Sequence, residues 1–356
     1  MRNNKNGSFP IYGGNGISGY SDEYNIDKPT IVIGRVGFYC GSIHYVKSKA
    51  WVTDNAFITS IYGNVYDIDF LYYLLTYCNL RQYSNSTAQP VISGKTIYPV
   101  HVPVPPIKEQ RKIVEKIEFW LSCISQLEFS QSKVKSTIKQ AKSKILDLAI
   151  HGKLVQQDPN DEPASELLKR INPKAEITCD TPQYGKLPKG WCLIQGKYLY
   201  KPMKSTKPKG SFFNYIDIDS IDNAKQSIDC VKVVKTENAP SRASRHTQKG
   251  DIVFSMVRPY LKNIAIVPDN DCIASTGFYV CSPSNVEISK YCYYVMISDY
   301  TVSGLNQFMK GDNSPSINKS DIDNWLFPLP PLTEQHRIVA KIEELFAQLD
   351  KIEASL

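Results

Sequence analysis

Lysine side chains gather in one stretch of the C-terminal half of the chain, from Lys197 to Lys209, with no acidic residue among them. An ammonium group on a flexible side chain suits contacts to DNA phosphates, which set affinity and register without reading the sequence. A solvated loop that keeps the protein soluble explains the same lysines equally well. The candidate phosphate contacts are Lys201, Lys204, Lys207 and Lys209.

A second stretch places basic residues, a tyrosine and an asparagine around an apolar run that predicts a strand over residues 251–257. Arginine reads guanine with two hydrogen bonds, asparagine reads adenine, and tyrosine stacks or contacts a phosphate. The alternative is a structural arginine paired with Asp251 or Asp269. The candidates for DNA contact are Arg242, Arg245, Lys249, Arg258, Tyr260, Lys262 and Asn263.

The N-terminal part of the chain offers similar residues around another predicted strand, residues 30–34. Arg35 follows this strand much as Arg258 follows the strand over residues 251–257. The candidates for DNA contact in this part are Arg35, Lys47 and Arg81.

No stretch of the sequence predicts catalysis. The run Gly14–Gly19 matches G-x-G-x-x-G, but no strand–helix unit follows, so a tight glycine-rich turn is the better interpretation. The histidines lack metal-ligand spacing, and the nine scattered cysteines predict free thiols in a reducing cytosol. No nucleophile elbow, phosphate-binding loop or adenine-methyltransferase signature appears. We therefore expect no catalytic residue and no metal in this chain.

Length and composition are those of a globular protein. The 356 residues predict two or three domains, and a hydrophobic share of 42% argues against disorder. The net charge of +7 fits a polyanionic partner without requiring one. There is no run of about 18 apolar residues to predict a membrane span, and the N-terminus does not resemble a signal peptide. We expect a cytoplasmic protein.

The elements that position these candidates come in two copies. The segment PVPPIKEQRKIVEKIE, residues 103–118, returns 225 positions later as PLPPLTEQHRIVAKIE, residues 328–343, with ten of sixteen positions identical. Each Pro-x-Pro-Pro fixes an extended backbone, and a helix is predicted to begin behind it, near Ile107 and Leu332. The chain therefore reads as two copies of an α+β domain, each followed by a helix.

Apolar residues recur by alternating steps of four and three along both helices, which is the heptad pattern of a coiled coil. The first helix is predicted to reach Ile150, a length of about 65 Å, which exceeds any one domain here. An amphipathic helix lying on its own domain is the alternative, and it accounts for only a few heptads. The seam includes Ile113, Ile117, Trp120, Ile124 and Leu127 in the first helix, and Ile338, Ile342, Leu345 and Leu349 in the second.

These segments resemble the specificity subunit of type I restriction-modification enzymes. The resemblance rests on the doubled P-x-P-P-x-x-E-Q segment, the connector over residues 152–168, and the domain opening LPKGW at residues 187–191. The family implies two target recognition domains in inverted orientation at the ends of an antiparallel coiled coil. Each domain would read one half of a bipartite site in double-stranded DNA, which favours DNA contact by the basic candidates.

The resemblance also implies partners. Two modification methyltransferase subunits would dock on the chain, and restriction nuclease-translocase subunits could join them. The chain itself would be a non-catalytic subunit that directs adenine methylation and cleavage. It would bind no cofactor, and S-adenosylmethionine, ATP and Mg²⁺ are expected on the partner subunits.

The first domain and the distal helix look shortened when each is compared with its other copy. The alternative function is therefore a truncated or silent cassette, or a half-subunit that docks methyltransferase or forms a homodimer without reading a full site. An enzyme fused to recognition domains ranks last. The expected segments are 1–103, recognition domain 1; 104–152, the central helix; 153–186, a connector with a short helix; 187–330, recognition domain 2; and 331–356, the distal helix.

Overall fold

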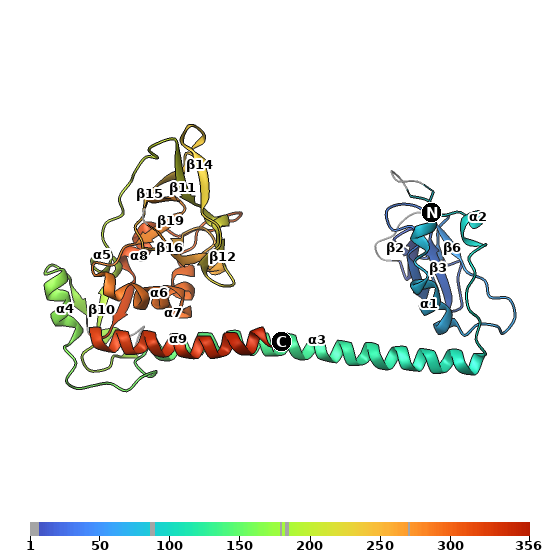
Figure 1. Cartoon of the computed structure of the whole chain (residues 1–356), viewed down its shortest axis with the longest axis horizontal. Helices are drawn as coiled ribbons and strands as arrows, with labels where there is room; N and C mark the ends of the chain where they lie inside the picture. The colour runs from blue at the N-terminus through green and yellow to red at the C-terminus, as the bar shows by residue number, and fades with distance from the viewer. Residues whose placement is uncertain (1–6, 86–89, 179, 182–184, 270) are drawn as a thin grey trace. The chain divides into compact units, whose positions relative to one another are not determined.

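A computed structural model describes residues 7–85, 90–178, 180–181, 185–269 and 271–356. The chain divides into two compact units, residues 1–130 and 131–356, each with its own core. The long helix α3 (Ile107–Ile150) begins in the first unit and ends in the second (Figure 1). Within the described ranges, no helix is long and apolar enough to cross a membrane.

Two small sheets make up the strands of the first unit. Its elements before α3 are β1 (Phe9–Gly13), β2 (Gly16–Ser21), β3 (Thr30–Gly34), β4 (Ile43–Val46), β5 (Trp51–Val52), β6 (Ala56–Ile58), α1 (Ile68–Tyr77), the 3₁₀ helix η1 (Leu80–Tyr83) and α2 (Gly94–Ile97). One sheet has the order β2-β1-β5 and the other the order β4-β3-β6. Because β1 and β2 form an antiparallel hairpin, the glycine-rich run is a turn and a strand, as expected, and no dinucleotide-binding unit.

Helix α1 covers the second of these sheets and contacts the first turns of α3. Its buried residues Phe70, Leu71 and Leu74 share a core cluster with Ile31 of β3 and Val114 of α3. Burial of these side chains, at roughly 1.5–3 kcal/mol each, holds the helix in place.

The second unit contains the remaining elements. They are α4 (Ala164–Ile171), β7 (Ile177–Thr178), β8 (Asp180–Thr181), β9 (Gly185–Lys186), β10 (Cys192–Gln195), α5 (Gly196–Leu199), β11 (Phe212–Ile216), η2 (Ile218–Ser220), β12 (Ile221–Asp222), β13 (Ser227–Ile228), β14 (Lys232–Lys235), η3 (Thr236–Asn238), β15 (Ala243–His246), β16 (Ile252–Ser255), η4 (Pro259–Leu261), β17 (Ile264–Ile266), β18 (Cys272–Ser275), β19 (Phe278–Cys281), η5 (Val286–Ile288), α6 (Ser289–Ile297), α7 (Asp299–Asn306), α8 (Lys319–Asn324), β20 (Leu326–Leu329) and α9 (Leu332–Ala354).

The strands of the second unit form several small sheets around one large core. The sheet orders include β14-β11-β18-β15, β17-β16-β19 and β20-β10-β7. Strand β16 is buried throughout, and its Phe254 belongs to the main core cluster, which also includes Leu146, Trp191 and Ile338. The mixture of strands and helices in both units confirms the expected α+β content.

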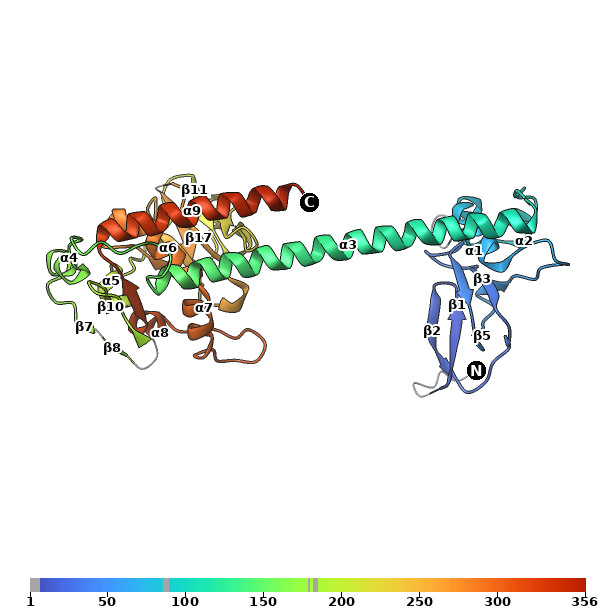
Figure 2. The ribbon, with the colours of Figure 1, turned by 90° about the horizontal axis from the view of Figure 1, so that it is seen from below.

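Helix α9 and the last part of α3 lie side by side and run antiparallel (Figures 1 and 2). The ammonium Nζ of Lys142 pairs with a carboxylate oxygen of Asp350 at 2.5 Å and lies 5.6 Å from the ring centroid of Phe346. Further along, Nε2 of Gln131 donates to the carbonyl oxygen of Leu356 at 2.6 Å. As the residue number rises on α3, it falls on α9.

The predicted helix starts at Ile107 and Leu332 are confirmed. The predicted seam residues meet different surroundings. Ile338 and Ile342 of α9 are fully buried, and Leu345 and Leu349 are half-buried. On α3, Ile113 packs in the core of the first unit, Ile117 is half-buried, and Trp120, Ile124 and Leu127 are exposed. A continuous coiled-coil seam therefore stays a prediction.

Candidate nucleic-acid interface

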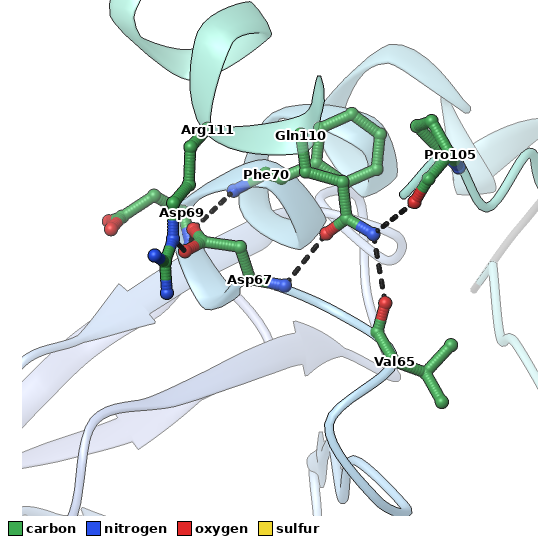
Figure 3. Close-up of polar contacts among 7 residues, drawn as sticks. All are labelled: Val65, Asp67, Asp69, Phe70, Pro105, Gln110 and Arg111. Carbon is green, nitrogen blue, oxygen red and sulfur yellow. Dashed lines mark hydrogen bonds and ion pairs between the residues drawn. The ribbon is translucent and has the colours of Figure 1, made fainter. Parts of the chain in front are cut away.

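Gln110, in the first turn of α3, ties three backbone segments together. Its Nε2 donates to the carbonyl oxygens of Pro105 and Val65, both at 2.8 Å, and its Oε1 accepts from the backbone N–H of Asp67 at 2.7 Å (Figure 3). Asp67 in turn caps α1, and its carboxylate accepts a hydrogen bond from Nε of Arg111 at 3.4 Å. The glutamine side chain is fully buried, so its role is to hold the framework.

Gln335 repeats the first of these bonds in the second unit. Its Nε2 donates to the carbonyl oxygen of Pro330 at 2.9 Å, again five residues earlier. The neighbouring Glu334 is also buried, and its carboxylate accepts from the indole N–H of Trp191 at 3.0 Å. Burial raises the pKa of Glu334 above its usual range. The Glu-Gln pair is identical in both copies of the repeat, so the sequence marks it as important. Its structural role becomes visible only with the hydrogen-bond partners that the tertiary structure supplies.

A second repeat joins the strand hairpins that carry several DNA candidates. In the first unit the backbone N–H of Gly34 donates to the carbonyl oxygen of Ser42 at 2.9 Å. In the second unit, 221 positions later, the N–H of Ser255 donates to the carbonyl oxygen of Asn263 at 3.0 Å. The β3–β4 and β16–β17 hairpins are therefore equivalent.

An offset of 221 positions pairs Arg258 with Gly37, which corrects the correspondence predicted for Arg258. Its backbone N–H donates to the carbonyl oxygen of Pro315 at 2.8 Å, and the matching bond in the first unit runs from Gly37 to Pro90 at 2.9 Å. Gly37 and not Arg35 therefore occupies the position of Arg258. The expected strand over residues 251–257 was too long, because β16 ends at Ser255 and Arg258 lies in the turn.

The lysine stretch lies beside the predicted arginine cluster. The backbone N–H of His246 donates to the carbonyl oxygen of Lys204 at 3.0 Å, which holds the stretch against β15. Lys207, Lys209 and His246 line a hollow of about 450 Å³ together with Phe212 of β11. All four lysine candidates, Lys201, Lys204, Lys207 and Lys209, are exposed.

The arginine candidates of the second unit differ in exposure. Arg242, Lys249 and Arg258 are exposed, whereas Arg245 is half-buried, and its Nε has no hydrogen-bond partner in the described part of the chain. The tyrosine of the turn, Tyr260, is 47% exposed.

Of the candidates at the end of this turn, Lys262 has structural partners and Asn263 is buried. The ammonium of Lys262 pairs with the carboxylate of Asp299 at 2.7 Å and reaches the carbonyl oxygen of Ile297 at 3.3 Å. Asn263 is only 6% exposed. Their contribution to DNA binding stays a prediction, and so does that of every other candidate.

The candidates of the first unit lie over aromatic rings. The guanidinium of Arg35 is 5.5 Å from the ring centroid of Phe57, and the ammonium of Lys47 is 5.2 Å from that of its neighbour Tyr45. Arg81 of η1 lies closest, 4.4 Å from the ring centroid of Phe38. Such stacking orients a cation while leaving its hydrogen-bond donors available.

These basic and aromatic side chains can bind an anionic polymer. Within the residues that the structure describes, no group of three or more His, Cys, Asp or Glu side chains could hold a metal ion. The described cysteines form no disulfide with one another, and Cys40, Cys192, Cys272, Cys281 and Cys292 are buried.

Known proteins resemble this chain in sequence. The sequence model of the type I restriction modification DNA specificity domain matches residues 2–141 and 194–356. Among curated proteins, the chain is 30% identical to the EcoprrI specificity subunit of Escherichia coli over 143 residues, covering 39% of this chain and 34% of that one. It is 28% identical to the Escherichia coli EcoEI specificity subunit over 279 residues, covering 68% and 46%.

A solved structure, the HsdS subunit from Thermoanaerobacter tengcongensis, aligns with 34% identity and a TM-score of 0.45, over 50% of this chain and 46% of that one. The chain spans about half the length or less of these relatives. Because the family's sequence model covers most of both units, this chain belongs to the type I restriction-modification DNA specificity domain family.

Proposed function

We propose that this chain is a specificity subunit that reads a bipartite site in double-stranded DNA and directs adenine methylation and cleavage by partner subunits. The observation that carries the proposal is the structural repeat. The same hairpin bonds recur 221 positions apart, and the same glutamine bond at the start of a long helix recurs 225 positions apart. One chain therefore holds two similar modules, as a reader of two half-sites requires.

The chemistry of the exposed side chains supports DNA as the ligand. Lysines on a loop beside β15 suit phosphate contacts, and arginine with tyrosine in a hairpin turn suits base contacts. The antiparallel pairing of α3 with α9 supports the use of the helices as a coiled-coil spacer between two recognition domains.

In this proposal the chain contributes recognition and the partners contribute catalysis, in the cytoplasm. Two modification methyltransferase subunits dock on it, and restriction nuclease-translocase subunits join the complex. S-adenosylmethionine, ATP and Mg²⁺ bind to those partner subunits and not to this chain.

The test is to co-express the chain with its modification subunit and to map N6-methyladenine across the host genome by single-molecule sequencing. A bipartite motif with a fixed gap is the expected result. A palindromic motif would mean that a single recognition domain reads DNA in a dimer of this chain. A stable complex without methylation would indicate a silent cassette, and the absence of any complex would overturn the proposal.

A further inference from the structure

The two equivalent hairpins each end in a turn that presents a tyrosine to solvent. We call these turns, residues 37–41 and 258–262, the tip loops. Tyr39 and Tyr260 lie 221 positions apart and are 52% and 47% exposed. The turn bonds match as well, because the N–H of Cys40 donates to the carbonyl oxygen of Gly37 and the N–H of Leu261 to that of Arg258, both at 2.9 Å.

Both tip loops require left-handed backbone at the same two positions. The first loop uses glycines there, with φ of 98° at Gly37 and 85° at Gly41. The second loop uses Arg258 at φ 47° and Lys262 at φ 54°. A side chain in this conformation is strained, and glycine would relieve the strain. Strained residues cluster at functional sites because the side chain is needed where the backbone places it.

Each of the two side chains at these strained positions has a different environment. Lys262 turns to Asp299, so its charge serves the fold. Arg258 is exposed, and the carbonyl oxygen of Asn313 accepts one hydrogen bond from its Nη2 at 2.8 Å. A guanidinium carries five N–H donors in a rigid fork, so this single anchor orients the group and leaves donors for a ligand.

The surroundings of Arg258 suit base edges better than phosphates. The arginine lines a hollow of about 460 Å³ with Asp219, Asp222, Asn223 and Ser314. Carboxylates repel a phosphate, which offers only acceptors. The major-groove edges of bases present both donors and acceptors, so a wall that mixes guanidinium, amide, hydroxyl and carboxylate groups can pair with them. The hollow beside Lys207 and Lys209 suits phosphates better, because its lining sets two lysines against one carboxylate, that of Asp271.

The first tip loop obtains its guanidinium from another element. Gly37 has no side chain, but Arg81 of η1 lies 4.4 Å from the ring centroid of Phe38, the next residue in the loop. The loop and η1 are in close contact, because a Cβ on Gly41 would lie 2.4 Å from the backbone nitrogen of Arg81. Each tip loop thus combines an exposed tyrosine with an arginine, although the two arginines come from different positions.

We infer that the tip loops are the equivalent base-reading elements of the two units, with Arg258 and Tyr260 specifying one half of the DNA site and Arg81 and Tyr39 the other. This inference rests on the proposed function and adds which residues set the sequence read by each module. The inference rests on Arg258, an exposed arginine at a strained backbone position, which lies beside a hollow lined by both donors and acceptors.

The test uses the full chain co-expressed with its modification subunit and compares N6-methyladenine motifs. Arg258→Gly removes the guanidinium and suits the left-handed backbone, so the fold is retained. In one half of the motif, the preference for the matched base over other bases is expected to fall roughly tenfold. The other half of the motif should stay intact. Arg81→Ala is expected to relax the opposite half. Arg170→Ala, an exposed arginine of α4, is the matched control and should leave both halves unchanged.

Arg258→Lys separates base reading from charge. Lysine keeps the positive charge but loses the planar fork, so base reading predicts the same relaxed half-motif as with Arg258→Gly. An unchanged motif with Arg258→Lys, or evenly weaker methylation at all sites with Arg258→Gly, would indicate a phosphate contact and overturn the inference. An unaltered wild-type motif in both Arg258 variants would also overturn it while leaving the proposed function standing. A wild-type complex without a sequence-defined motif would overturn the proposed function itself.

Discussion

The backbone N–H of Asp67 donates to Oε1 of Gln110 at 2.7 Å, so the residue that caps α1 is held by a side chain 43 positions later in the chain. Through this bond the start of the long helix fixes the start of the helix that covers the β4-β3-β6 sheet. The recognition candidates and the long helix are thereby linked within the first unit.

Replacing Gln110 with alanine is expected to destabilise the first unit by about 2–4 kcal/mol. The change leaves the N–H of Asp67 and the carbonyl oxygens of Val65 and Pro105 without their partner in a buried site. Thermal unfolding followed by calorimetry measures the effect. Gln126→Ala, at an exposed position of the same helix, is the control and should change stability by less than about 0.5 kcal/mol. Equal effects of the two variants would contradict the framework role.

Truncating Ile342 to alanine is expected to loosen α9 from the main core of the second unit. Ile342 is fully buried in the main core, and a large-to-small change there costs about 2–5 kcal/mol. Hydrogen exchange of peptides from residues 332–354 should accelerate. Ile352→Ala removes the same atoms from a side chain that is 49% exposed on the same helix, and it should leave exchange nearly unchanged.

Glu334 gives the second unit a pH dependence of known sign. Its pKa is raised by burial, so the folded state binds a proton more tightly than the unfolded state. Stability contributed by this group is therefore greatest at low pH and is lost as the pH rises from about 4.5 through the raised pKa. Glu334→Gln keeps an acceptor for Trp191 and should remove this loss, so the variant gains stability relative to wild type at pH 7 and not at pH 4.

Calorimetry across this pH range measures the difference. Asp161 does not interfere, because hydrogen bonding to Arg337 lowers its pKa, and its contribution disappears only at still lower pH. Glu353→Gln, at an exposed position of α9, is the control. A gain for Glu334→Gln that is the same at both pH values would contradict the assignment.

Replacing Lys207 and Lys209 with glutamine is expected to weaken DNA binding for all sequences alike. If both lysines contact phosphates, the slope of log affinity against log salt should fall by about 0.9 for each contact, because fewer counterions are released. Fluorescence anisotropy of the co-expressed complex on matched and unrelated duplexes provides the measurement. A change in preference between the duplexes, with the slope unaltered, would contradict a phosphate role. Lys169→Gln, in α4, is the control.

The sequence predicted the elements whose determinants are local. The helices begin at Ile107 and Leu332 because each proline segment ends there, and the short helix over residues 164–171 follows Pro163. The equivalence of the β3–β4 and β16–β17 hairpins is not visible in the sequence, because the bonds that they share join backbone atoms. Between residues 34–42 and 255–263 only the valine and the tyrosine are shared.

The environments of the candidate side chains depended on distant residues. Lys262 was a candidate for DNA contact from its residue type alone, and its ion-pair partner Asp299 lies 37 positions later in the chain. The role of Gln110 likewise depends on Val65 and Asp67, which no local pattern connects to it. A spacing rule reports which residue types are present, whereas tertiary contacts decide which of their atoms remain available.

The matched bonds at Gly34–Ser42 and Ser255–Asn263 enclose segments of equal length. Residues 34–42 would therefore enter the hairpin of the second unit with both strand ends already in register. The reverse exchange would place a lysine at position 41, where a Cβ would lie 2.4 Å from the backbone nitrogen of Arg81. Under the proposed base-reading role, grafting these nine residues would change what the second unit reads, while the sheets and helices that hold its turn keep their sequence.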